Sequence, residues 1–146
     1  MIIIGHDIID FKPFCRVNNA DEASKDLSGS IVIYKANEAV NIPSGSTLIF
    51  KFTDNQSLIK CCRKNGINFA VETESIKEAL LANAAGASYI VVSGKDVAKN
   101  IQDLAENYLF DAKILLKIKT ENEIEEAAKV GIDGVLFMKG IINGDF

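Results

Sequence analysis

Two lysines interrupt apolar segments of the sequence and could act as nucleophiles. Lys51 lies in the segment 48–52 and Lys117 in the segment 114–118. A lysine that is removed from water has a lowered pKa, and its neutral amine can form an imine with a carbonyl compound. Glu72 ends a third apolar segment, where it could serve as the proton-transfer partner. Lys117, Lys51 and Glu72 are therefore the catalytic candidates. The alternative is that each ammonium reaches water at a strand end or pairs with a carboxylate such as Glu72.

A second candidate site, for ligand binding, lies where a predicted strand meets a predicted helix, at Ser93, Gly94 and Lys95. Backbone amides at the start of a helix, together with the helix dipole, can hold a small anion. The segment is not a P-loop, because Asp96 stands where a serine or threonine is required and Tyr89 where an earlier glycine belongs. The alternative is ordinary capping of the helix by Ser93.

A metal site has little support in the sequence. His6 is the only histidine of the chain, which excludes sites built from several histidines. His6, Asp7 and Asp10 could form a local metal-binding cluster. We favour a strand-end turn in which the aspartates bond the backbone, and we expect neither a metal nor a cofactor.

The cysteines indicate a reducing compartment. Cys15, Cys61 and Cys62 are an odd set without the CxxC spacing of zinc and redox sites, which fits the cytosol. On a helix, adjacent residues point about 100° apart. We therefore expect one of Cys61 and Cys62 to pack in the core as a small apolar side chain.

Composition indicates one soluble globular domain over residues 1–146. Hydrophobic residues make up 48% of the sequence and charged residues 25%, which are ordinary values for a globular protein. The formal net charge of -4 argues against nucleic acid as a partner. No segment has the roughly 20 apolar residues of a membrane-spanning helix. Gly5 ends the apolar residues 2–4 at once, so we interpret them as a first strand rather than an export signal and expect a cytoplasmic protein.

Repeated turn signals predict how the elements that carry the candidates are arranged. Gly66, Gly86 and Gly131 stand where helices end, and each is followed after two residues by a short apolar run. Two capping boxes, at 75–78 and 120–123, mark helix starts. The boxes are 45 residues apart, as are Gly86 and Gly131, so a helix, strand, helix, strand segment repeats.

The alternation of strands and one-faced helices predicts right-handed crossovers and a parallel sheet. We expect a helix at 54–65 and strands at 48–52, 68–72, 89–93, 113–118 and 134–138. The helix after residue 75 is expected to bury one apolar face, formed by Ile76, Ala79, Leu80 and Ala84. Ligands bind outside the carboxyl ends of parallel strands, and these ends carry Lys51, Glu72 and Lys117.

The first third of the chain is less regular. Apolar runs predict strands at 2–4, 14–17 and 31–35, with a short helix at about 20–27. A turn-like segment at 41–45 separates Lys35 from Leu48, which favours an antiparallel edge or hairpin near the N-terminus.

Residues 119–137, in which Gly131, Asp133 and Gly134 lead into an apolar run, resemble the last βα units of phosphate-binding TIM barrels. The resemblance covers about residues 66–140 and implies an architecture rather than a particular reaction. A complete barrel of eight units needs about 250 residues. The glycines that hold phosphate after the last two strands are also replaced, which leaves only Gly140 for that role.

Two architectures remain open. The chain is either a half-barrel, which a second copy could complete as a homodimer, or an open flavodoxin-like sheet. We favour the open form, a three-layer, mainly parallel α/β sheet of about six strands.

Two functions also remain open. We favour a non-enzymatic binding or protein-interaction domain on a degenerate TIM-barrel-like scaffold, with a small anionic ligand at the strand ends. The alternative is a lyase or isomerase that uses Lys117 or Lys51, with Glu72, on a small anionic carbonyl compound or a phosphorylated metabolite.

Overall fold

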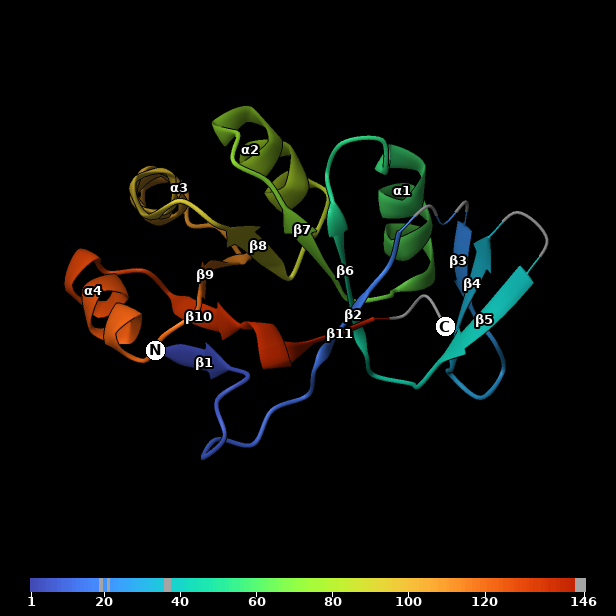
Figure 1. Ribbon diagram of the computed structural model, residues 1–146. Coiled ribbons are helices and arrows are strands. Elements are labelled where there is room, and N and C mark those ends of the chain that lie inside the picture. The colour runs from blue at the N-terminus through green and yellow to red at the C-terminus, as the bar shows by residue number, and fades with distance from the viewer. Residues whose placement is uncertain (19, 21, 36–37, 144–146) are drawn as a thin grey trace.

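The computed structural model describes residues 1–18, 20, 22–35 and 38–143, which form two sheets and four α-helices (Figure 1). The larger sheet has eight strands, and every pairing within it is parallel. In spatial order its strands are β1 (Ile2–Ile4), β10 (Gly134–Phe137), β9 (Lys113–Ile118), β8 (Tyr89–Val92), β7 (Phe69–Glu72), β6 (Thr47–Lys51), β2 (Phe14–Arg16) and β11 (Ile141–Asn143). The predicted mainly parallel α/β fold is confirmed.

The larger sheet is curled into a half-barrel. β10 lies next to one edge of the sheet and β11 forms the other edge, yet only the short 3₁₀-helix η1 (Met138–Gly140) connects them. A flat sheet of eight strands would separate these positions by about 30 Å, because neighbouring strands lie about 4.8 Å apart. A connection of three residues is too short for this distance. The sheet must therefore bend back on itself to bring the end of β10 close to the start of β11. The half-barrel is therefore the form adopted, not the open sheet that the sequence favours.

The two faces of the curled sheet are covered differently. The inner face has a small core of its own, to which seven strands each contribute one fully enclosed side chain: Ile4, Phe14, Ile49, Ala70, Val91, Leu115 and Leu136. No helix contributes to this inner cluster within the described residues.

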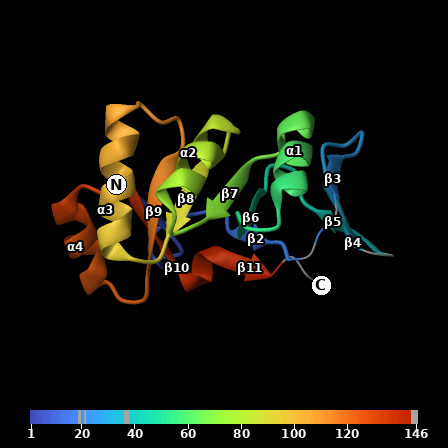
Figure 2. The same ribbon diagram turned by 90° about the horizontal axis from the view of Figure 1, so that it is seen from above.

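The helices lie on the outer face, where they build the main core with the other side of the strands (Figures 1 and 2). They are α1 (Gln56–Asn65), α2 (Ile76–Ala84), α3 (Lys95–Asn107) and α4 (Asn122–Val130). None of the helices in the described part of the chain is long and apolar enough to cross a membrane.

The smaller sheet is antiparallel, as the sequence predicts for this region. It consists of β3 (Glu22–Lys25), β4 (Ile31–Lys35) and β5 (Glu38–Ile42). The helix expected at about 20–27 is wrong, because β3 occupies this segment and buries Ala23. A tight turn explains the difference: Asp26 Oδ1 accepts from the amides of Ser28 and Ser30, and Gly29 has a φ of +87°. This turn pairs the segment with β4, so the segment forms a strand instead of a helix.

The predicted helix ends and helix starts are largely confirmed. Gly66 and Gly131 cap α1 and α4 in the left-handed conformation, and Gly86, which follows the C-cap residue Ala85 of α2, has a φ of +92°. Each capping box forms only half of its bonds. Ser75 accepts from the amide of Glu78, whereas in the second box the carboxylate of Glu123 accepts from the amides before α4.

Burial of the helices follows the prediction for α1 but not for α2. Cys62 is fully buried, as expected for one member of the cysteine pair. On α2 the small residues Ala79 and Ala82 face the sheet, while Ile76 and Leu80 are 43% and 39% exposed. The expected apolar face of α2 is therefore wrong in its large residues, because the helix approaches the sheet through its alanines.

Candidate functional site

A cavity of about 400 Å³ opens at the carboxyl ends of β6, β7, β8 and β9. Its lining includes all three residues that the sequence singles out as catalytic candidates, Lys51, Glu72 and Lys117. Thus the structure brings these residues together in one place.

The strands place these side chains through their alternation. Ile49, Ala70 and Leu115 face the interior of the half-barrel. Residues two positions later in a strand point to the same face, and these are Lys51, Glu72 and Lys117. The interior is therefore apolar at its centre and charged at its carboxyl mouth.

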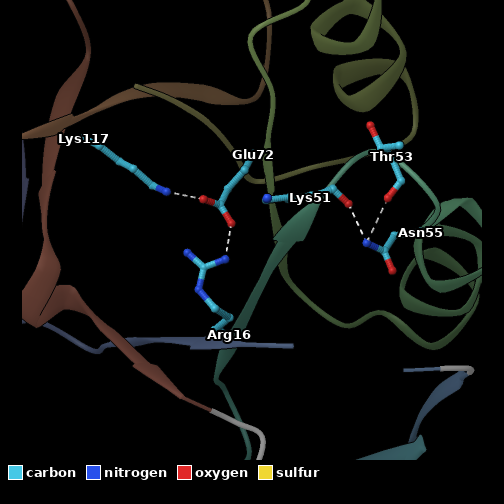
Figure 3. Close-up of polar contacts among 6 residues, drawn as sticks. All are labelled: Arg16, Lys51, Thr53, Asn55, Glu72 and Lys117. Atoms are coloured by element: carbon cyan, nitrogen blue, oxygen red, sulfur yellow. Dashed lines mark hydrogen bonds and ion pairs between the residues drawn. The ribbon is translucent and has the colours of Figure 1, made fainter. Parts of the chain in front are cut away.

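Glu72 is the centre of the charged cluster (Figure 3). Its Oε1 accepts from Nη1 of Arg16 and its Oε2 accepts from Nζ of Lys117. The Glu72 side chain is only 10% exposed, and Lys117 is 27% exposed. Burial acts to raise the pKa of the Glu72 carboxyl, but the hydrogen bonds and charges of Arg16 and Lys117 outweigh it and hold that pKa below its ordinary value. Glu72 is therefore ionised at neutral pH.

Lys51 lies opposite Glu72 in the β6–β7 register and extends toward the same cluster (Figure 3). Within the described part of the chain its ammonium makes no hydrogen bond or ion pair. Its backbone is held firmly, because Nδ2 of Asn55 donates to the carbonyl of Lys51 at 2.7 Å and to that of Thr53 at 3.3 Å. The turn at the end of β6 therefore fixes where the Lys51 side chain begins.

Arg16 is the participant that the sequence reasoning missed. It is the last residue of β2 and reaches Glu72 across β6. A signal was present, because Arg16 interrupts the apolar segment 14–17 in the way that Lys51 interrupts 48–52. A single cation in a short apolar strand marks the mouth of this fold in all three cases.

The predicted anion site before α3 is already occupied by the protein itself. The amide of Ser93 donates to Oε1 of Glu74 at 2.6 Å, so a carboxylate of the chain takes the place expected for a ligand. Gly94 is the N-cap residue of α3, so no side chain caps this helix. Nζ of Lys95 lies 3.8 Å from Oε2 of Glu126 on α4. Of these three residues only Ser93 lines the cavity.

Gly140 does not lie in this cavity. It is buried in the seam where η1 leads into β11, and a Cβ there would lie 2.8 Å from Leu136 and 2.9 Å from Ile4. The glycine is thus explained by close packing, and its position gives no support to the expected phosphate contact.

A second cavity of about 300 Å³ lies beside the ends of β1, β9 and β10. Nε2 of His6 is 2.6 Å from Oε1 of Glu121. Nζ of Lys139 donates to the carboxylate of Asp7 at 2.7 Å, and this bond lowers the pKa of the Asp7 carboxyl. Nδ1 of His6 accepts from the amide of Ile8, so the strand-end turn is held by the histidine rather than by an aspartate. Among the described residues no group of three histidine, cysteine or acidic side chains is arranged to hold a metal ion.

The charged cluster at the first cavity has a clear chemical consequence. The ion pair between Lys117 and Glu72 requires a protonated lysine, whereas imine formation requires a neutral amine. Fixed opposite charges of this kind suit the recognition of a charged ligand, and imine chemistry would first have to move the proton from Lys117.

Comparisons with known proteins add no family to this description: no protein-family model matches the chain, and no curated protein sequence matches it significantly.

Proposed function

We propose that this chain is a non-enzymatic binding domain for a small metabolite, whose anionic group is held by Lys51 and Lys117 at the mouth of the half-barrel. The observation that carries the proposal is the arrangement around Glu72. One ionised carboxylate engages both Arg16 and Lys117, and a third cation, Lys51, extends toward it. Three cations around one carboxylate leave positive charge on the strand side of the cavity, where an anionic group can bind.

The position of the cavity supports the same proposal. Ligands of α/β folds bind outside the carboxyl ends of the strands, where loops and strand ends can vary without disturbing the core. The cavity of about 400 Å³ is within the size range of small-molecule sites. Its floor is well packed, because Val91 and the strands beneath it belong to the two cores.

Amide NMR tests the proposal with sodium pyruvate and inorganic phosphate as probes. We expect at least one probe to shift amides near residues 51, 72 and 117. The substitution Lys51→Met should weaken this binding about tenfold, as loss of one charged hydrogen bond does, and it should preserve the fold because Lys51 is exposed. Lys117→Met should have a similar effect.

The matched control is Lys95→Met, because Lys95 carries the same charge but pairs with Glu126 outside the cavity. Binding that is unchanged in both Lys51→Met and Lys117→Met would contradict the proposal. Turnover of a keto acid, an aldehyde or a phosphorylated sugar that is lost in Lys117→Ala would contradict its non-enzymatic part.

A second candidate function is a lysine-dependent lyase or isomerase. The observation that favours it is that Lys51, Lys117 and Glu72 line one cavity. In this reading Lys117 passes its proton to Glu72, the neutral amine adds to a substrate carbonyl, and loss of water gives an imine.

Borohydride trapping tests this candidate directly. Incubation with pyruvate and sodium borohydride should then convert the imine into a stable secondary amine on Lys117, detected by mass spectrometry. No adduct on any lysine, and no change of activity in Lys117→Ala, would rule the imine mechanism out.

A further inference from the structure

The cavity at the mouth of the half-barrel has two chemically different ends. On the side of the sheet it is lined by Lys51 and Lys117, which come from β6 and β9. On the side of the helices it is lined by Glu74, in the turn after β7, and by Glu78, in the first turn of α2. A ligand in the cavity therefore meets ammonium groups that come from the strands and carboxylates that come from the turn after β7 and from α2.

The carboxylates of Glu74 and Glu78 are each held in place by a hydrogen bond, and each has a second oxygen that can accept another. Oε1 of Glu74 accepts from the amide of Ser93 at 2.6 Å, and Oε1 of Glu78 accepts from Oγ1 of Thr73 at 2.6 Å. Thr73 is itself buried and also accepts from the amide of Ser75 at 3.0 Å. The second oxygen of each carboxylate has no hydrogen-bond partner among the described residues. These oxygens are therefore available to accept hydrogen bonds from a ligand.

Charge balance restricts the ligand. The cluster contains three cations, Arg16, Lys51 and Lys117, and the cavity contributes three carboxylates, Glu72, Glu74 and Glu78. The site is therefore neutral as a whole, but its charges are separated, because Glu72 lies among the cations and the other two lie at the helix side. A dianion would be attracted at one end and repelled at the other, whereas a ligand with opposite charges at its two ends matches both.

We infer that the ligand of this site is dipolar: a small amino acid whose carboxylate pairs with Lys51 and Lys117 and whose ammonium pairs with Glu74 and Glu78. This inference rests on the proposed anion-binding function and names the class of its ligand. An ammonium supplies up to three donors, and two outer oxygens are positioned to accept them. The short apolar part of such a ligand faces Val91, which also lines the cavity.

A titration with ω-amino acids tests the inference. Amide NMR compares the unbranched amino acids of three to six carbons with their matched carboxylates and ω-hydroxy acids, so that only the terminal group differs. We expect one amino acid to bind about tenfold more tightly than both of its analogues, which is the effect of one hydrogen bond to a charged group. The double substitution Glu74→Gln and Glu78→Gln should remove most of this preference.

The glutamine variant is chosen because its amide oxygen still accepts from Ser93 and Thr73, which keeps the loop in place. Glu125→Gln and Glu126→Gln are the matched control, since both carboxylates are exposed on α4 and do not line the cavity.

The outcomes distinguish failure of the dipolar-ligand inference from failure of the anion-binding function. If carboxylates, hydroxy acids and amino acids bind equally and all depend on Lys51, the dipolar ligand is refuted while the anion-binding function stands. If alkylamines bind as well as amino acids, or if no probe shifts the amides around the cavity, both proposals are refuted.

Discussion

The guanidinium of Arg16 on β2 donates to the carboxylate of Glu72 on β7, across the intervening strand β6. The two residues are 56 positions apart in the chain. The same carboxylate accepts from Lys117 on β9, on its other side. Glu72 thus links strands on both sides of β7 at the mouth of the half-barrel.

Glu72 makes stability depend on pH in a definite direction. Its pKa is lower in the folded protein than the ordinary value of 4.5, so the ionised form stabilises the fold. This contribution is complete above pH 4.5 and is lost as the pH falls through the lowered pKa. We expect Glu72→Gln to reduce the free energy of unfolding by about 1 to 3 kcal/mol at pH 7 and to reduce the loss of stability on acidification. Urea unfolding at pH 7 and pH 3 measures both effects.

The matched control for Glu72 is Glu126→Gln, because its carboxylate forms an exposed ion pair with Lys95. Exposed pairs contribute about 0 to 1 kcal/mol, so this variant should follow the wild-type pH profile. An equal response of both variants to pH would show that the pairing around Glu72 does not govern acid stability.

A second prediction concerns the stability contributed by a buried polar contact at the opposite end of the half-barrel. Nε2 of Gln102 on α3 donates to Asp133 at 3.1 Å, and Oε1 of Gln102 accepts from the amide of Asp133 at 2.9 Å. Gln102→Leu would leave Oδ1 and the backbone amide of Asp133 without a partner among the described residues, although Oδ2 keeps its bond to the amide of Ile114, at a cost of about 1 to 3 kcal/mol. Chemical unfolding should show this loss, whereas Lys99→Gln, which breaks an exposed ion pair on the same helix, should cost less than about 0.5 kcal/mol.

Gly134 is required by a close approach of two strands. A Cβ at this position would lie 2.5 Å from the carbonyl oxygen of Ile2 and 2.7 Å from Leu115. Gly134→Ala should therefore force β1 away from β10 and destabilise the protein by about 1 to 3 kcal/mol. At Gly94, where the nearest atom would lie 3.8 Å away, the same substitution should change the melting temperature little. Equal melting temperatures for the two variants would contradict the close contact.

The adjacent cysteines should differ in reactivity. Burial, with a smaller contribution from neighbouring Cys61, raises the pKa of the Cys62 thiol to about 12. The thiolate is the nucleophile in alkylation, so Cys62 should be protected at pH 8. Burial also raises the pKa of Cys15. Iodoacetamide should therefore label only Cys61 in the native protein, and Cys61→Ser should take up label only after denaturation, as mass spectrometry can follow.

Much of the candidate site could be predicted because its residues are marked locally. Lys51 and Lys117 are single cations within apolar segments, and alternation along a strand then assigns their direction. Arg16 carries the same mark. Its partner could not be identified, since no local pattern indicates which strands lie beside β2.

The anion site at Ser93, Gly94 and Lys95 shows the opposite case. The start of a helix after a strand is a local signal, and the helix is present. What the signal cannot show is that Glu74, 19 residues away, would bind the amide of Ser93. A local pattern indicates an available donor, but the tertiary structure decides whether the protein itself uses it.

The sequence by itself determined the elements from β6 to β10, their parallel arrangement and the edge at which charged residues gather. These follow from local physical chemistry: left-handed glycines end helices, capping residues start them, and apolar runs form buried strands. Only the tertiary structure decided that the sheet curls, that the segment 22–25 pairs as a strand, and that Arg16, Glu72 and Lys117 meet. These features depend on contacts between segments that are distant in the sequence. The short connection from β10 to β11 requires a curled sheet, and no local sequence pattern predicts this curvature.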